Sequence, residues 1–155
     1  MPIRRLFLTL FNIGRLPLAP GTFGSLAAIP LGVGILAYSP ATLFLSALLV
    51  GAVAIKEINA YESESNSHDA SEIVVDELVG MWLAMAMVGW NWLGITLAFL
   101  FFRLFDIKKP SIIGRIDREV GGGLGVVADD VVAGFFGGLA ALLVLGVVQK
   151  FGIAL

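Results

Sequence analysis

The amino-acid sequence predicts an all-α, multi-pass helical membrane protein with about four to five membrane-embedded helices and interfacial polar segments. We expect one domain over residues 1–155. Apolar residues make up 58% of the chain and charged residues only 14%, whereas ordinary globular chains carry about 25% charged residues. The mean hydropathy is +0.95. The charges also fall in blocks separated by long uncharged runs, as expected where apolar helices alternate with polar segments.

Composition excludes several kinds of chemistry. The sequence has no cysteine, which rules out disulfides, thiolate metal sites and cysteine nucleophiles. A net charge of −2, without a basic stretch interleaved with aromatic residues, predicts no nucleic-acid binding. The apolar run 6–11 is too short for a secretory signal.

The first uncharged run, 16–55, predicts a helical hairpin. Its length of about 40 residues corresponds to roughly 60 Å of helix, too long for one crossing of a hydrocarbon core of about 30 Å. Pro40 lies inside the run and disfavours helix at the residue before it. We therefore expect helices over 23–37 and 41–56.

The segment before this hairpin is rich in proline and glycine and leads into a helix start. Thr22 or Ser25 is expected to cap that helix. A helix N-terminus flanked by glycine offers free N–H groups to a phosphate, so both residues are candidates for substrate binding. The alternative is a plain turn with a cap.

A polar block, 56–77, follows the hairpin, and we expect a loop over its Ser- and Asn-rich part, 63–71. The next uncharged run, 78–102, could cross the membrane once. Glycine, asparagine and two tryptophans in its middle, 89–92, favour a turn at a membrane interface. We therefore favour a second hairpin.

This second hairpin has helices over 72–88 and 92–107, and it brings both acidic blocks of the chain to one side. A last crossing helix is expected over 131–148. Nine of the ten basic residues then share a side, with Lys150 alone opposite. The positive-inside rule makes the shared side cytoplasmic.

The segment 103–130 concentrates five of the ten basic and five of the twelve acidic residues, with a run of glycines among them. So many charges beside apolar spans cost solvation energy unless they act together. We interpret the segment as part of a magnesium-dependent phosphate site at the membrane surface.

Several carboxylates lie where an apolar run begins or ends. Magnesium prefers hard oxygen ligands, usually one or two carboxylates with water and substrate phosphate. A solvated acidic rim is the alternative, and it suits Glu57, Glu62, Glu64 and Glu119 better. The carboxylates beside apolar runs are Asp76, Glu77, Asp106, Asp117, Asp129 and Asp130.

The other candidate groups would hold or protonate a phosphate ester. Arg103 could bind a phosphate bidentately or pair with Asp106. Gly122 and Gly123 permit close approach of the backbone to a ligand. His68 could give a proton to the leaving group or be an ordinary loop residue. With no cysteine, one histidine and no aspartyl-phosphate motif, a metal-activated water with a carboxylate base is the remaining mechanism.

With these residues in view, the chain resembles the phosphatidylglycerophosphatase A family, bacterial membrane phosphatases of phospholipid synthesis. The similarity covers roughly residues 12–140, and one departure is Gly121, where the family carries a histidine. The matching stretches are 19–26, His68-Asp69, 73–77, 80–82, 102–106, Lys109-Pro110, Asp117-Arg118, 122–125 and 129–134.

The resemblance implies hydrolysis of phosphatidylglycerophosphate to phosphatidylglycerol with Mg²⁺, at the bacterial inner membrane among its phospholipids. It implies functional roles for Asp76, Glu77, Arg103, Asp106, Lys109, Asp117, Asp129 and Asp130, without dividing them. We assign catalytic roles to Asp106, Asp76 and His68. We assign metal binding to Glu77, Asp117, Asp129 and Asp130. We assign substrate binding to Arg103, Lys109, Thr22, Ser25, Gly122 and Gly123.

Two other functions are alternatives. A CDP-alcohol phosphotransferase shares the spacing Gly125-x3-Asp129, but its upstream D-G-x2-A-R element is absent. An ion or proton carrier could use the same carboxylates, although carboxylates in mid-span would suit it better.

Overall fold

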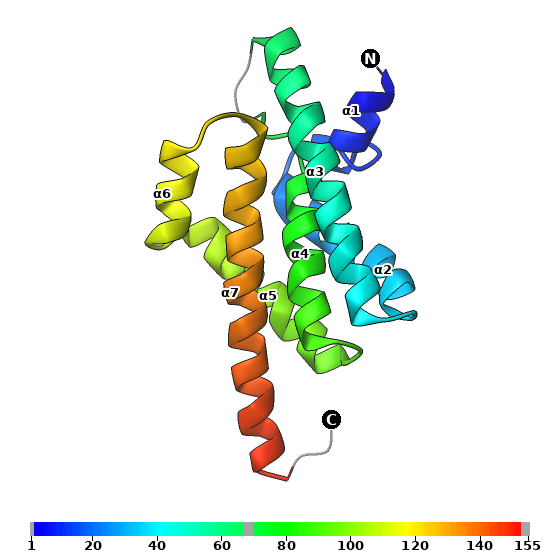
Figure 1. Cartoon of the computed structure of the whole chain (residues 1–155), viewed down its shortest axis with the longest axis vertical. Helices are drawn as coiled ribbons and strands as arrows, with labels where there is room; N and C mark the ends of the chain where they lie inside the picture. The colour runs from blue at the N-terminus through cyan, green and yellow to red at the C-terminus, as the bar shows by residue number, and fades with distance from the viewer. Residues whose placement is uncertain (1, 67–69, 153–155) are drawn as a thin grey trace.

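The computed structural model describes residues 2–66 and 70–152. All regular structure in these ranges is helical, which confirms the predicted all-α fold, and Figure 1 shows the arrangement. The elements are α1 (Pro2–Leu8), the 3-10 helix η1 (Ile13–Arg15), α2 (Pro20–Leu36), α3 (Pro40–Ser65), α4 (Val75–Val88), α5 (Trp92–Lys108), α6 (Ile112–Glu119) and α7 (Gly122–Lys150).

Helix α4 forms the centre of the bundle. Every residue over 78–85 is buried, because α2, α3, α5 and α7 all pack against this helix. An apolar helix buried on all sides is expected only in a core position. The two carboxylates in the first turn of α4, Asp76 and Glu77, are therefore fixed at one end of the core.

The predicted hairpin of α4 and α5 is confirmed. Gly89 ends α4 with φ 68°, a left-handed value that glycine adopts without strain. The side chain of Asn91 then caps α5 by accepting a hydrogen bond of 2.7 Å from the N–H of Gly94. The chain therefore turns back at 89–91, and α5 runs back behind α7 toward α6 (Figure 1).

Helix α3 is longer than the sequence predicted. It was expected to end near 56, and 63–71 was expected to be a loop, but the helix continues to Ser65. Arg4 of α1 binds Glu57 at 2.8 Å and Glu64 at 2.6 Å. These ion pairs and the good helix propensity of glutamate outweigh the polarity that suggested a loop.

Helix α7 begins nine residues earlier than predicted, at Gly122 instead of 131. The glycines suggested a loop, yet they serve close packing: a Cβ on Gly123 would lie 2.4 Å from the carbonyl oxygen of Ile55. Asn59 of α3 also accepts a hydrogen bond of 2.7 Å from the N–H of Gly123. Asp129 therefore lies within α7 and not at a helix end.

Asn59 supplies the cap that α7 lacks locally, since Gly121 has no side chain to cap the helix. We expect Asn59→Ala to lower the free energy of unfolding by about 1 kcal/mol, the usual cost of losing a helix cap. Asn59→Asp keeps the acceptor and should retain most of the stability. Thermal unfolding in detergent measures both variants, and equal losses for the two would contradict this role.

Helix α2 starts earlier than predicted, and without a side-chain cap. Pro20 occupies its first turn, and Ala19 is the N-cap residue. The predicted caps are therefore wrong: Thr22 lies inside the helix, and the hydroxyl of Ser25 is buried and donates to the carbonyl of Gly21 at 2.8 Å. Proline at a helix start, where the missing N–H costs nothing, accounts for the shift.

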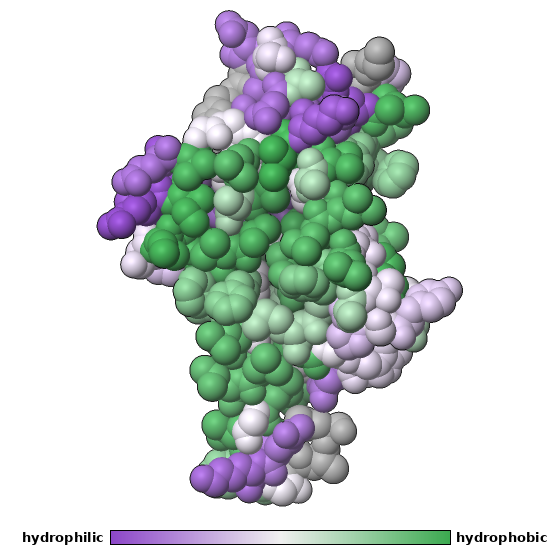
Figure 2. Space-filling view, viewed as in Figure 1, coloured by the Kyte–Doolittle hydropathy of each residue, from purple (hydrophilic) through white to green (hydrophobic). Residues whose placement is uncertain are grey.

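The outer surface of the bundle suits a membrane. Helices α3 and α7 are long and apolar enough to cross one, and only 28% and 33% of their most apolar stretches is buried, whereas the core helix of a soluble protein would be mostly buried. Figure 2 shows an apolar band between a polar upper end and a polar lower tip. Membrane association explains this pattern, since contiguous exposed apolar surface is unfavourable in water.

Candidate active site

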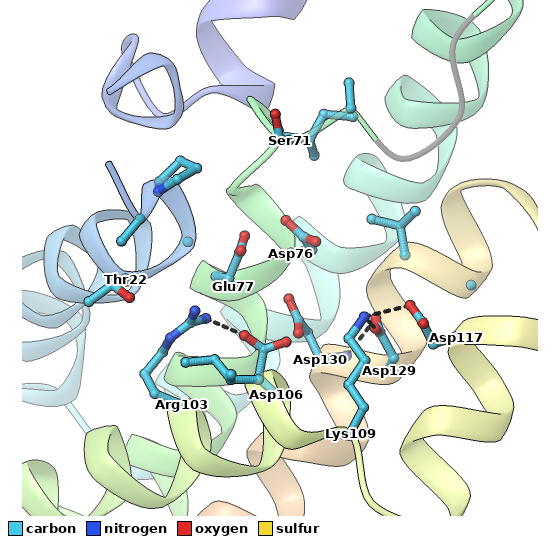
Figure 3. A pocket seen from close by; sticks show the side chains of 18 of the residues that line it. Thr22, Ser71, Asp76, Glu77, Arg103, Asp106, Lys109, Asp117, Asp129 and Asp130 are labelled. Atoms are coloured by element: carbon cyan, nitrogen blue, oxygen red, sulfur yellow. Dashed lines mark hydrogen bonds and ion pairs between the residues drawn. The ribbon is translucent and has the colours of Figure 1, made fainter. Parts of the chain in front are cut away.

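A cavity of about 410 Å³ opens where the ends of α2, α4, α5 and α6 meet α7. Its wall carries six carboxylates and two cations, drawn in Figure 3. The second hairpin is what brings them together, because it places α4's first turn beside α5's last turn. The charged lining residues are Asp76, Glu77, Arg103, Asp106, Lys109, Asp117, Asp129 and Asp130.

The carboxylates form two overlapping groups, and Asp130 belongs to both. One group contains Asp76 and Glu77, and the other contains Asp106 and Asp129. Within each group of three, one oxygen of every carboxylate lies within 4.8 Å of the others. Asp76, Asp129 and Asp130 are buried, so their mutual repulsion is poorly screened by water.

Arg103 lies on the α2 side of the cavity and forms an ion pair with Asp106, one turn further along α5. The side chains of both residues are 13% exposed. The Nε of Arg103 is buried without a hydrogen-bond partner among the described residues. Arg103 therefore retains donor capacity for an anion in the cavity.

Lys109 lies on the α6 side and bridges two elements. Its Nζ binds Asp117 of α6 at 2.5 Å and Asp129 of α7 at 2.9 Å. Burial opposes the charged form, but the hydrogen bonds to Asp117 and Asp129 outweigh it and hold the pKa of Lys109 above its usual value. The lysine is thus a permanent cation that attaches α6 to the cavity.

Gly21 allows α2 to reach the cavity. A Cβ at this position would lie 2.3 Å from Oε1 of Glu77 and 3.1 Å from Nη2 of Arg103. Glycine lets α2 approach both side chains without displacing either of them. In the sequence, Gly21 belongs to the segment 19–26, and its place directly after Pro20 is the one local signal for this role.

The structure places most of the predicted site residues at the cavity. Thr22 also lines it, and so does Ser71, which the sequence interpretation did not propose. Ser25, Gly122 and Gly123 do not line it: Ser25 bonds to its own helix, and the two glycines pack against α3. His68 lies outside the described residues.

The donor set fits a hard divalent cation. Two buried oxygens, Oδ1 of Asp76 and Oε2 of Glu77, have no hydrogen-bond partner among the described residues. Unpartnered buried carboxylate oxygens are costly, and a cation would satisfy them directly or through its bound water. All the donors are oxygens, which suits magnesium or calcium and not a soft metal. Asp117, predicted as a ligand, binds Lys109 and belongs to neither carboxylate group.

Comparison with known proteins identifies the family. Residues 6–145 match the family description "Phosphatidylglycerophosphatase A", which is most of the chain. This chain belongs to the phosphatidylglycerophosphatase A family. Membership confirms the predicted resemblance and makes the chain a phosphatase, so the cavity with its carboxylates is the candidate active site.

Members of the phosphatidylglycerophosphatase A family in two bacteria are similar over most of their length. The Escherichia coli K12 protein of that name is 36% identical over 126 residues, 80% of this chain and 73% of the relative. The Haemophilus influenzae protein of the same name is 38% identical over 133 residues, 81% and 78% of the two chains.

A third relative carries a different name. A putative phosphatidylinositol-3-phosphatase of Bacteroides thetaiotaomicron is 37% identical over 134 residues, 81% of this chain and 83% of its own. No solved structure matches the chain.

Proposed function

We propose that the protein is a magnesium-dependent lipid phosphatase that hydrolyses phosphatidylglycerophosphate to phosphatidylglycerol and inorganic phosphate. The observation that carries this is the pair of overlapping carboxylate groups around Asp130, with two buried oxygens left without partners. The names of the E. coli and H. influenzae relatives support the lipid substrate.

The names of the relatives also support a chemical class for the substrate. Phosphatidylglycerophosphate and phosphatidylinositol 3-phosphate, the lipid that the B. thetaiotaomicron relative's name points to, both carry a phosphate monoester on a polyol. A phosphodiester joins that polyol to diacylglycerol. We place the monoester at the carboxylate groups, and phosphatidylglycerophosphate is the first candidate because two relatives are named for it.

Roles follow from the contacts. Bound magnesium would supply Lewis-acid charge and activate water. Asp130, shared by both carboxylate groups, is the central ligand residue, with Glu77 and Asp129 beside it. Arg103 donates to the non-bridging phosphate oxygens through the N–H groups that Asp106 does not use.

Asp76 accepts the proton of the attacking water, because its Oδ1 is buried at the cavity without another partner. The water oxygen bonds to phosphorus, the ester P–O bond breaks, and the polyol oxygen leaves and takes up a proton. His68 remains the predicted donor of that proton.

A carrier function is less well supported. A conduction path needs ionisable groups distributed across the membrane, whereas the described carboxylates of the cavity gather where the helix ends meet. No described acidic or basic residue occurs over 131–149 of α7.

Phosphate release from three lipids tests the proposed substrate. Purified protein in mild detergent with magnesium should release phosphate from phosphatidylglycerophosphate faster than from phosphatidylinositol 3-phosphate or phosphatidic acid. Preference for phosphatidylinositol 3-phosphate would reassign the substrate within the class. No release from any of the three by folded protein would contradict the proposed function.

For localisation, we propose the bacterial inner membrane, with several helices embedded and the active site on the cytoplasmic face. The basic residues of α1 and α6 support this orientation by the positive-inside rule. Helix α1 lies at the polar upper end, and α7, which ends at Lys150, reaches the opposite tip (Figures 1 and 2). Helix α7, about 43 Å long by its 29 residues, is sufficient to cross a bilayer.

Single cysteines test this orientation, because the sequence has none of its own. We expect Lys150→Cys to react with a membrane-impermeant maleimide in intact spheroplasts. Glu119→Cys, an exposed position on α6, should react only after lysis. The reverse pattern would place the active site on the outer face.

A further inference from the structure

A second, shallower cavity adjoins the active-site cavity. It has a volume of about 390 Å³ and is lined by residues 14–17, Pro20, Ser71 and Glu72. Pro20 and Ser71 line both cavities, so the two cavities adjoin at these residues. A ligand that fills the first cavity and is too large for it can extend into the second.

The second cavity contains a cation that the fold does not require. The side chain of Arg15 is 52% exposed, and among the described residues its one ion pair is to Glu72 at 3.6 Å. Glu72 is held without it: Tyr61 donates to this carboxylate at 2.5 Å, and Arg5 binds both of its oxygens at 3.0 Å. The Arg15 guanidinium can therefore turn to an incoming anion without leaving a buried charge unpaired.

Exposed apolar side chains flank this cation in the sequence, and one of them, Leu16, lines the same cavity. Phe11 is 79%, Leu16 41% and Leu18 75% exposed. A guanidinium beside exposed apolar residues matches the interfacial region of a lipid, where a charged phosphate lies next to the start of the acyl chains. The second cavity thus offers contacts for the part of a lipid that lies between headgroup and chains.

The active-site cavity cannot supply a cation for a second phosphate. Its wall has six carboxylates and two cations. Lys109 is paired with two of the carboxylates, and the donors that Arg103 keeps free are assigned to the monoester. A phosphodiester anion placed there would meet net negative charge. The phosphodiester therefore needs a cation outside that cavity, separated from the monoester by no more than the length of one polyol. Arg15 lines the adjoining cavity.

We propose that Arg15 binds the phosphodiester of the lipid substrate and so selects lipids whose phosphate monoester is carried on a polyol headgroup. This rests on the proposed function. The monoester then occupies the carboxylate cavity, the polyol passes Pro20 and Ser71, and the acyl chains leave the second cavity past Leu16. Phosphatidic acid, which has the monoester and the chains but no diester, gains nothing from Arg15.

The test compares Arg15→Gln with wild type on phosphatidylglycerophosphate and phosphatidic acid, in the same detergent micelles with magnesium. The quantity measured is the ratio of kcat/KM for the two lipids. Loss of a charge-assisted contact to phosphate should lower this ratio by about tenfold to a hundredfold, mainly through KM. Arg15→Lys, which keeps the charge but not the bidentate geometry, should recover part of the ratio.

Arg118→Gln is the matched control. It removes an exposed arginine of α6, on the other side of the active-site cavity, that has no ion pair within the described ranges, and it should leave the ratio unchanged. An unchanged ratio in Arg15→Gln, or equal losses on both lipids, would overturn the proposal. So would a lowered ratio in Arg118→Gln alone, which would place the diester at α6. If wild-type protein hydrolyses neither lipid, that result contradicts the proposed function itself, before the role of Arg15 is tested.

Discussion

Replacing Asp130 by asparagine is expected to lower kcat/KM for phosphate release by about a thousandfold or more, a loss typical of removing a central electrostatic group from an active site. Asp130 is buried and is the one residue that belongs to both carboxylate groups. The asparagine keeps the shape of the side chain and removes the charge that both groups share. Steady-state kinetics on phosphatidylglycerophosphate measure the effect.

A second readout separates the metal role from misfolding. Without added magnesium, Asp130→Asn should unfold at a higher temperature than wild type, because one of several repelling buried carboxylates is gone. Magnesium should stabilise wild type and stabilise the variant much less. Glu119→Gln, an exposed acid of α6, should change neither quantity. Retained activity in Asp130→Asn would contradict the role given to this residue.

Gly134→Ala is expected to have the second large effect, through helix packing. A Cβ at this position of α7 would lie 2.2 Å from the carbonyl oxygen of Gly80 in α4. Backbone atoms cannot rotate away, so the two helices must separate. We expect a loss of about 1–3 kcal/mol in the free energy of unfolding from overpacking. We also expect about a hundredfold lower turnover, since Asp76 and Asp130 are carried by the two helices that separate.

Gly146→Ala provides the control for this variant. It makes the same substitution in the same helix, at a position where no atom lies within 4 Å of the added Cβ. Alanine is a better helix former than glycine, so this variant should be as stable as wild type or slightly more stable. Equal unfolding temperatures and kinetics for the two alanine variants would show that the crossing of α4 and α7 does not position the site.

The helices that the sequence predicted well are those whose limits depend on local chemistry. The turn between α4 and α5 follows from Gly89 and Asn91, one at positive φ and the other a side-chain cap. The uncharged runs located the apolar helices because the composition of a run restricts it to an apolar environment.

The limits that the sequence missed depend on distant contacts. The last turns of α3 are supported by Arg4 from α1, and the start of α7 by Asn59 and the backbone of α3. Neither contact has a signature in the local sequence, where glutamates and glycines alone favour a loop.

The active site likewise combines features that the local sequence reveals with contacts that form only in the folded chain. Carboxylates beside apolar runs could be recognised as candidates, because such charges are costly without a function. Their grouping could not be recognised: Asp117 binds Lys109 across 8 positions of sequence, and Asp130 joins the carboxylates of α4 only in the folded chain. Ser25, expected to bind phosphate, does not line the cavity, and its hydroxyl donates to the carbonyl of Gly21 within α2.

The metal requirement of phosphate release tests the central claim most directly. Wild-type protein, purified in detergent and treated with EDTA, is assayed on phosphatidylglycerophosphate before and after excess magnesium is added. A magnesium-dependent carboxylate site predicts no release in EDTA and full recovery with magnesium. Undiminished release in EDTA, from protein shown to be free of metal, would contradict it.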